Sequence, residues 1–192
     1  MNSSSFVPFA ITVCGIDELA ALRGGGVTHL LSLMDPGWPF PEAIEGLGAI
    51  DRLELRFHDV VDPSAEWTAP EIEHVERLLA FGRTLTEPGG HLVVHCHMGI
   101  SRSTAAMLLL LAQARPDRPA AEALAEVVRI RDHAWPNLRL VEIGDVLLGR
   151  DGTLVAAVVE RYRDMLRRRP ELRRAMIKLG RSRELNQVPP EA

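Results

Sequence analysis

The feature that most constrains this chain is a short apolar run followed directly by a polar loop and a run of helix formers. Leu92, Val93 and Val94 are typical of a buried strand, and residues 104–111 are nearly all strong helix formers. A strand, a loop of seven residues and a helix bring the N–H groups of residues 97–102 around one point, at the positive end of the helix dipole. This order of elements predicts an anion-binding cradle.

Side chains in this loop suit the cradle to chemistry on a phosphoryl group. Cys96 opens the loop and Arg102 closes it, so a thiol and a planar guanidinium are expected at the same point. A guanidinium can hold two phosphoryl oxygens at once, and it favours a thiolate nearby. Ser103 can offer its hydroxyl to the sulfur, while Gly99 permits the positive φ that a tight loop needs.

The pattern Cys-x5-Arg-Ser, with His before the Cys and Gly three residues after it, resembles the signature loop of the cysteine-dependent protein tyrosine phosphatase superfamily. The resemblance implies that Cys96 attacks phosphorus and forms a cysteinyl-phosphate intermediate, which water then hydrolyses. It implies catalytic roles for Cys96, Arg102 and Ser103, and it implies no cofactor. The residues expected to bind the substrate phosphate are His97, Met98, Gly99, Ile100, Ser101 and Arg102.

This chemistry needs a general acid that protonates the leaving oxygen, usually a carboxyl at the end of a neighbouring strand. Asp59 and Asp62 both qualify. Residues 57–63 resemble the Trp-Pro-Asp loop of tyrosine phosphatases, in which Pro falls four residues after Asp, and Pro63 stands four residues after Asp59. Dual-specificity members place the acid nearer to the cysteine, which favours Asp62. We expect Asp59 to be the acid and keep Asp62 as the alternative.

A second resemblance lies downstream of the loop. Residues 128–137 read Val-Arg-x-Arg-x4-Pro-Asn, similar to a segment of dual-specificity phosphatases in which an Arg precedes a Pro-Asn pair and the next helix. By resemblance Asn137 positions local backbone, and a helix cap is the alternative. The resemblance covers roughly residues 8–150, and some of its shorter motifs are most similar to a bacterial group of predicted tyrosine phosphatases.

The order of the expected elements favours an α/β fold. Strands are expected over residues 9–13, 27–33, 53–57 and 92–94, and helices over 16–22, 72–81, 102–114, 120–131, 138–148 and 154–166. Thr68 is the expected N-cap of the second helix, with Pro70 inside its first turn. Because strands and helices alternate first and helices follow, we predict a central, mostly parallel sheet flanked by helices, with a helical C-terminal part.

Cysteine content and hydropathy bear on the compartment. The chain of 192 residues suits one domain and has two cysteines, Cys14 and Cys96, which form no disulfide framework and suit a reducing compartment. No signal peptide is evident and no apolar run reaches transmembrane length, so we predict a cytoplasmic protein. Cys14 is expected to be a small buried residue rather than a resolving thiol. No metal site is expected, since the adjacent His95, Cys96 and His97 are poorly placed to point at one ion.

Charge is distributed unevenly along the chain. The net charge is −4, yet residues 161–183 carry ten Arg or Lys and only two acidic residues. We therefore predict a phosphatase domain over residues 1–150 and a basic helical segment and tail over 151–192. The basic part is expected to be a solvated helix packed on the domain, with docking to an acidic partner, an anionic membrane surface or nucleic acid as the sharper alternative.

These observations lead to a prediction of function. We expect a phosphomonoesterase, a protein tyrosine or dual-specificity phosphatase, whose substrate is a phosphorylated protein or a small phosphomonoester. Two alternatives are a rhodanese-like sulfurtransferase, which also uses a cysteine loop, and a pseudophosphatase that only binds phosphate. The first usually has a loop of another length, and the second would be expected to have lost Cys96 or Arg102, which are both present.

Overall fold

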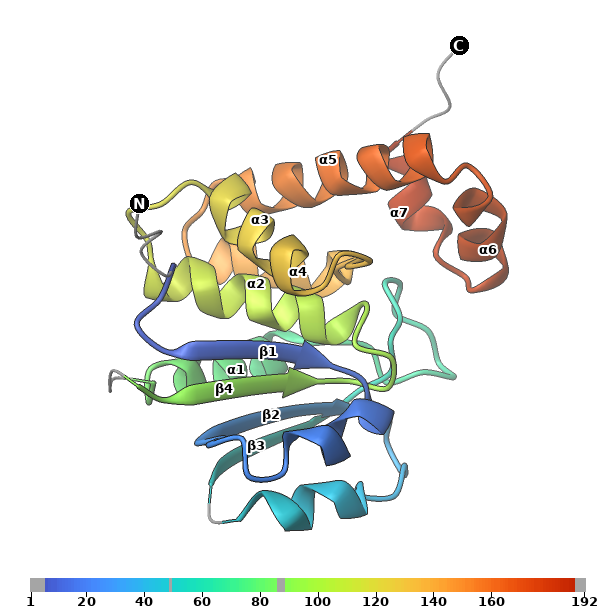
Figure 1. The fold of residues 1–192 in the computed structure, drawn as a ribbon. Coiled ribbons are helices and arrows are strands. Elements are labelled where there is room, and N and C mark those ends of the chain that lie inside the picture. Colours follow the sequence, from blue (N-terminus) through green and yellow to red (C-terminus); the bar gives the residue numbers. More distant parts are fainter. Residues whose placement is uncertain (1–5, 49, 86–88, 189–192) are drawn as a thin grey trace.

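The computed structural model describes residues 6–48, 50–85 and 89–188. Within them, strands β1 (Ala10–Cys14), β2 (His29–Met34), β3 (Asp51–Arg56) and β4 (His91–His95) form one sheet in the order β1-β4-β2-β3. Every neighbouring pair is parallel, which confirms the predicted α/β architecture. All strands therefore end at the same edge, to which the arrows in Figure 1 point.

The two faces of the sheet carry different kinds of helix. On one face lie α1 (Ile72–Gly82), α2 (Arg102–Ala114), α3 (Ala120–Ile130) and α4 (Leu138–Leu147). The other face is covered by two 3₁₀-helices, η1 (Ile16–Leu22) and η2 (Glu42–Leu47). Leu31 and Val94 pack with the α-helices, whereas Leu30 and Val93 pack against Leu19 and Ile44. The period of two along buried strands explains this division.

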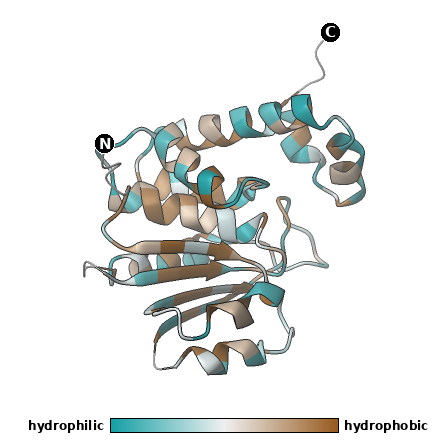
Figure 2. Cartoon of the chain, in the orientation of Figure 1, coloured by the Kyte–Doolittle hydropathy of each residue, from teal (hydrophilic) through white to brown (hydrophobic). Residues whose placement is uncertain are grey.

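Helix α2 runs through the middle of the helical layer. Every residue from Arg102 to Ala112 is buried. A helix that is apolar all round is a core helix, and Figure 2 shows the brown strands packed beneath it. Because α2 is enclosed by the sheet and by α1, α3 and α4, the loop that precedes it has a rigid support.

The N-cap of α1 differs from the prediction. The helix begins at Ile72 after the N-cap Glu71, and Thr68 is not its cap. Instead Thr68 pairs with His58 across the preceding loop: its N–H donates to His58 Nδ1 at 3.0 Å and its carbonyl accepts the His58 N–H at 2.8 Å. The backbone of Thr68 thus closes the loop that follows β3, which the local cap pattern did not indicate.

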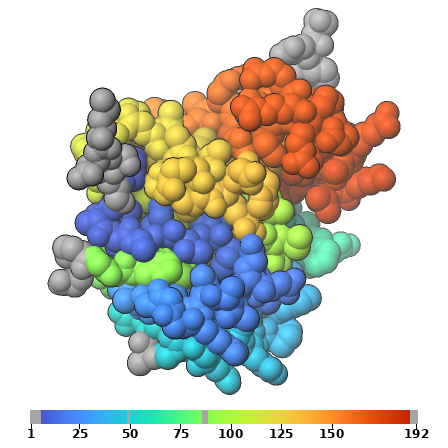
Figure 3. Space-filling view, in the orientation of Figure 1, coloured from blue at the N-terminus to red at the C-terminus, as the bar shows by residue number. Residues whose placement is uncertain are grey.

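The C-terminal part consists of α5 (Thr153–Arg168), α6 (Leu172–Lys178) and α7 (Ser182–Asn186). Leu154, Val158 and Tyr162 of α5 are buried in the core that α2 and the sheet share. Buried Asp145 of α4 fixes the start of α5 by accepting the N–H groups of Gly152, Leu154 and Val155. In Figure 3 the orange and red residues lie against the yellow ones of α3 and α4. The predicted division into a phosphatase domain over residues 1–150 and a basic segment over 151–192 stays a prediction, because it concerns which part can fold alone.

None of the helices in the described ranges is both long enough and apolar enough to cross a membrane. Across the same ranges, no three His, Cys, Asp or Glu side chains are grouped in a way that could hold a metal ion.

Candidate active site

The loop between β4 and α2 lies at the carboxyl edge of the sheet. Within the described part of the chain, the backbone N–H groups of residues 97–102 have no hydrogen-bond acceptor. Gly99 has φ of 69°, and a Cβ there would stand 2.6 Å from the carbonyl carbon of Cys14, so only glycine fits. A row of loop N–H groups without protein partners is a binding site for an anion.

The sulfur of Cys96 lies in this loop. Cys96 Sγ is 3.1 Å from Ser103 Oγ, and both residues are buried. Behind them His95 is fully buried, with Nε2 2.7 Å from Ser32 Oγ on β2. Burial lowers the pKa of His95 to about 4, so its ring is neutral at physiological pH. The sulfur therefore has a hydroxyl beside it and no imidazolium from His95.

The guanidinium of Arg102 is fixed through one of its nitrogens, while another has no partner within the described residues. Its Nη1 donates to Asp35 Oδ1 and to the Phe57 carbonyl, both at 2.6 Å, and its side chain is only 3% exposed. Its Nε is buried and has no partner in the described part of the chain. An orphaned donor on a guanidinium that is fixed elsewhere fits an oxyanion as its missing partner.

Asp35 also orders His97. The Asp35 N–H donates to His97 Nε2 at 3.4 Å, and the edge of the Trp38 ring packs on the histidine, with the ring centroids 4.5 Å apart. Burial lowers the pKa of His97, so its neutral ring can accept this hydrogen bond. Asp35 follows β2 directly.

Arg131 supports the loop from the other side. Its Nε donates to the Gly99 carbonyl and its Nη2 to the Met98 carbonyl, both at 3.1 Å. Two further bonds, of 2.8 and 2.7 Å, join it to the carboxylate of Glu18. Arg131 thereby turns two loop carbonyls away from the cradle and leaves the N–H groups facing it, which fits the Arg that precedes the Pro-Asn pair in the motif.

The two candidate acids lie in different surroundings. Asp59 Oδ1 accepts hydrogen bonds from Ser101 Oγ at 2.7 Å, Asn137 Nδ2 at 2.8 Å and Arg181 Nη1 at 3.0 Å. Burial disfavours the charge, but Arg181 and Arg102 outweigh it and hold the pKa of Asp59 below its usual value. Asp62 is largely exposed and faces Arg183 at 3.6 Å. Asp59 alone lies at the cradle.

Asn137 fills both of the roles considered for it. Its Oδ1 accepts the Leu140 N–H at 3.1 Å and caps α4, while its Nδ2 reaches Asp59 and the Val60 carbonyl. One side chain therefore fixes a helix start and the loop that carries Asp59.

A cavity of about 230 Å³ opens onto these groups. Its floor is polar and includes Cys96, Arg102 and Asp59, whereas much of its wall is apolar. The remaining lining residues are His97, Met98, Ile100, Ser101, Trp135, Met176, Leu179 and Arg181. The last three come from the C-terminal part, and Figure 1 shows α6 and α7 at the edge where the strands end.

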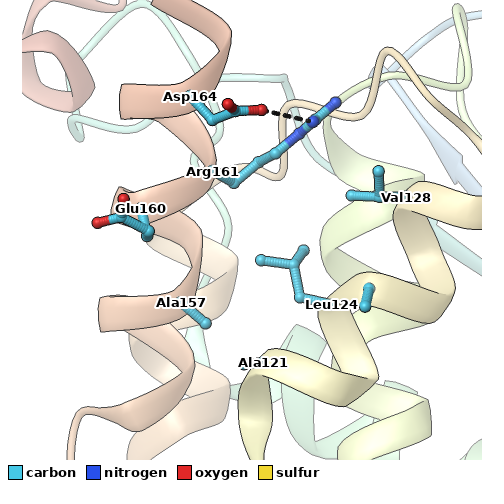
Figure 4. Close-up of a pocket in the computed structure, with 8 residues that line it drawn as sticks. Ala121, Leu124, Val128, Ala157, Glu160, Arg161 and Asp164 are labelled. Carbon is cyan, nitrogen blue, oxygen red and sulfur yellow. Dashed lines mark ion pairs between the residues drawn. The ribbon is translucent and has the colours of Figure 1, made fainter.

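A second cavity, of about 280 Å³, lies between α3 and α5 (Figure 4). It is lined by Ala121, Leu124, Ala125, Val128, Ala157, Glu160, Arg161 and Asp164. Arg161 and Asp164 both come from α5, and Arg161 Nη1 lies 3.8 Å from Asp164 Oδ2. Because no cysteine, serine or histidine lines it, the nucleophile and the orphaned donors single out the first cavity.

The sequence prediction missed Asp35 and Arg181, which both touch the predicted site residues. Asp35 could have been found as an acid directly after a strand of a parallel sheet, since such positions meet at one edge. Arg181 stands 122 residues from Asp59 and outside the region of resemblance, and no local pattern distinguishes it from the other arginines near it.

Comparison with known proteins agrees with this geometry. No protein-family model matches the chain. Over 94 residues the chain is 39% identical to dual specificity protein phosphatase 26 of Rattus norvegicus, a match that covers 47% of the chain and 40% of the relative. The crystal structure of human DUSP28 superposes with a TM-score of 0.55 at 20% identity, over 76% of the chain and 97% of that protein. The crystal structure of Tk-PTP in the active form superposes with a TM-score of 0.53 at 22% identity, over 78% of the chain and 99% of that protein.

Over the 94 matched residues the chain is similar to a dual specificity phosphatase, and its fold is that of the cysteine-dependent phosphatases in these solved structures. It spans less than half the length of the curated relative, and the likeness to the solved structures concerns the fold. The bacterial group stays a prediction. The loop from Cys96 to Ser103, which resembles the signature loop of the cysteine-dependent protein tyrosine phosphatase superfamily, is called the signature loop below.

Loss of the Arg131 side chain should loosen this signature loop. We expect Arg131→Met to weaken the binding of inorganic phosphate roughly tenfold, the equivalent of about 1.4 kcal/mol, because two loop carbonyls lose their donor. Isothermal titration calorimetry measures the affinity. Arg129→Met is the matched control, since Arg129 is exposed and pairs with Glu126 on its own helix. Equal affinities in the two variants would contradict the role of Arg131.

Proposed function

We propose that this protein is a phosphomonoesterase, a protein tyrosine or dual-specificity phosphatase, that acts through a cysteinyl-phosphate intermediate. One observation carries the proposal. The sulfur of Cys96, the orphaned Nε of Arg102 and the unpartnered loop N–H groups belong to one loop at one cavity. A nucleophile and a set of oxyanion donors at one point are what phosphoryl transfer needs.

In the first half-reaction the substrate phosphate lies in the cradle on the loop amides and Arg102. The Cys96 thiolate attacks phosphorus, the bond from phosphorus to the ester oxygen breaks, and a cysteinyl phosphate forms. The leaving oxygen takes a proton from Asp59, which becomes a carboxylate. A phosphate dianion beside Asp59 raises the pKa of that carboxyl, so substrate binding itself favours the protonated acid.

In the second half-reaction water attacks phosphorus. Asp59, now a carboxylate, accepts a proton from that water, the bond from phosphorus to sulfur breaks, and inorganic phosphate leaves. Cys96 departs as a thiolate, stabilised by the hydroxyl of Ser103 at 3.1 Å. Asp59 is a proton donor in one step and a proton acceptor in the next, which is how one carboxyl serves both.

The cavity wall favours an aryl ester among possible substrates. Met98, Met176 and Leu179 surround the opening with apolar atoms, and Met98 and Leu179 are 68% and 70% exposed. Exposed apolar side chains at a site gain contact when a flat apolar group enters. A phosphotyrosine ring satisfies this wall, whereas the short chain of phosphoserine leaves it in water.

The basic segment 161–183 is proposed to bind an acidic partner, mainly through two of its side chains. Eight of its ten basic side chains bond to groups of the same chain. Within the described residues Arg174 and Lys178 have no such partner and would carry the contact. Binding of that kind would weaken steeply with added salt.

A cytoplasmic location is also proposed. Its support is that Cys14 and Cys96 are both unpaired thiols, which suits a reducing compartment.

Cys96→Ser tests the nucleophile. We expect turnover of p-nitrophenyl phosphate in EDTA to fall on the order of 10⁴-fold or more, because the intermediate cannot form, while phosphate still binds in the cradle. Steady-state kinetics and calorimetry measure the two quantities. Thiosulfate:cyanide sulfurtransfer, assayed alongside, would reveal the rhodanese-like alternative. Substantial hydrolysis by the serine variant would overturn the mechanism.

Asp59→Asn tests the acid. We expect hydrolysis of phenyl and alkyl phosphates to fall roughly 10²-fold or more, and that of esters with good leaving groups much less, because only poor leaving groups need the proton. The decline of kcat/KM at high pH should also flatten, since it follows deprotonation of the acid. Asp62→Asn is the control and should behave like the wild type. The reverse pattern would assign the acid to Asp62.

Leu179→Ser tests the apolar wall. We expect KM for a phosphotyrosine peptide to rise about fivefold, since apolar contact with the ring is lost, and KM for an alkyl phosphate to stay unchanged. Ile177→Ser is the matched control on the same segment, because Ile177 is 55% exposed but does not line the cavity. If KM for the phosphotyrosine peptide rises in both variants, or in neither, the apolar wall does not select the leaving group.

A further inference from the structure

Arg181 is a buried arginine with every nitrogen engaged. It is 6% exposed, and its guanidinium connects the acid, the signature loop and α7. Nη1 donates to Asp59 Oδ1 and Nη2 to Ser101 Oγ, both at 3.0 Å. Nη2 and Nε donate to the two carboxylate oxygens of Glu184, at 2.6 and 2.9 Å. An arginine used in this way has a fixed position and no freedom to act as a mobile surface charge.

Glu184 fixes the position of Arg181 by accepting two of its hydrogen bonds. It is fully buried and also accepts the Trp135 Nε1–H at 2.7 Å, the Leu138 N–H at 3.1 Å and the Tyr162 hydroxyl at 3.2 Å. These donors come from the segment before α4, from the start of α4 and from α5. Glu184 is therefore tied to the core, and it holds the guanidinium with two parallel bonds.

The backbone between α6 and α7 delivers Arg181 to this place. Gly180 has φ of 70°, its N–H bonds to the Ile177 carbonyl at 3.0 Å, and the Arg181 N–H bonds to the Met176 carbonyl at 2.9 Å. This left-handed turn ends α6 and redirects the chain into the site. Residue 181 lies beyond residues 8–150, the region that resembles the superfamily.

We propose that Arg181 is a further positioning residue of the reaction, acting through Asp59, and this inference rests on the proposed function. Arg181 holds the Asp59 carboxyl over the cradle and favours its ionised form. The donors from Ser101, Asn137 and Arg181 all meet at Oδ1, and within the described residues Oδ2 has no donor. Oδ2 is thus the oxygen that gives a proton to the leaving group and later takes one from water.

The charges around Asp59 fix the sign of its pH effect. Arg181 from the C-terminal part and Arg102 from α2 face it and lower its pKa, as do the hydrogen bonds from Ser101 and Asn137. His97, whose pKa burial lowers, is close enough to feel the charges of Arg102 and Asp59. Glu184 accepts from Arg181 and from the Tyr162 hydroxyl. Loss of Arg181 should therefore raise the pKa of Asp59. Since the acid must be protonated in the first half-reaction, the decline of kcat/KM would then move to higher pH.

The experiment compares Arg181→Met, Arg181→Lys and wild type in the full chain, with phenyl phosphate as substrate. In the Met variant we expect the basic limb of kcat/KM to move upward by about one pH unit or more, the effect of losing an opposite charge within 4 Å. The Lys variant keeps the charge and should hold the limb near its wild-type position. Arg173→Met is the matched control, because within residues 6–48, 50–85 and 89–188 Arg173 on α6 donates only to the Val188 carbonyl.

A second readout needs no turnover. Titration of the Asp59 carboxyl by ¹³C NMR should show a higher pKa in the Met variant than in the wild type. If both the limb and the titration are unchanged, the inference is wrong even when the wild type hydrolyses the ester. If the titration shifts but the wild type shows no phosphatase activity, the proposed function fails and the contact stands.

A folding defect is separable from this effect. Removing Arg181 leaves Glu184 buried without its cation, which is costly. The double variant Arg181→Met with Glu184→Gln removes both charges and should recover part of the stability lost in the single variant, while keeping the raised pKa of Asp59. An unshifted pKa in the folded double variant would also overturn the proposal.

Discussion

A row of backbone N–H groups without acceptors is costly in a folded protein, at roughly 1–3 kcal/mol for each buried group. The loop after β4 keeps such a row, and much of the surrounding structure holds it in place. Arg131 binds the carbonyls on the outer side of the loop. Gly99 supplies the one backbone conformation that fits against Cys14. Helix α2, buried all round, gives the loop a fixed end.

The charged groups at the site form one pair, Asp35 with Arg102, and one set of three, Asp59 with Arg181 and Glu184. Asp35 anchors Arg102 through Nη1 and leaves Nε for a ligand, so this pair is incomplete without an anion. Arg181 has all three of its nitrogens engaged and joins Asp59 to Glu184, so no nitrogen is left for a ligand. The pair can recognise phosphate, while the set of three can only hold an acid in place. The division follows from geometry, since both arginines are buried.

The fold and the centre of the site could be predicted from sequence because the determining signals are local. A β-α unit with Cys96 and Arg102 at its turn contains strand, loop and helix within residues 91–114, and the four parallel strands follow from alternation. The N-cap of α1 could not be predicted, because Thr68 is used by a loop contact to His58 that no cap pattern encodes. Arg181 could not be predicted either, since its partners lie far away in sequence and many arginines surround it.

The amide of Asn137 has a consequence for how the site opens. One half of that side chain caps α4 and the other half holds the loop of Asp59, so neither can move alone. Swinging Asp59 away from the cradle would cost contacts to Asn137, Ser101 and Arg181 together. The proposed acid is thus preorganised before substrate arrives. In the proposed mechanism, entry and product release then depend on side chains that line the cavity, such as Met98 and Leu179, rather than on a hinged acid loop.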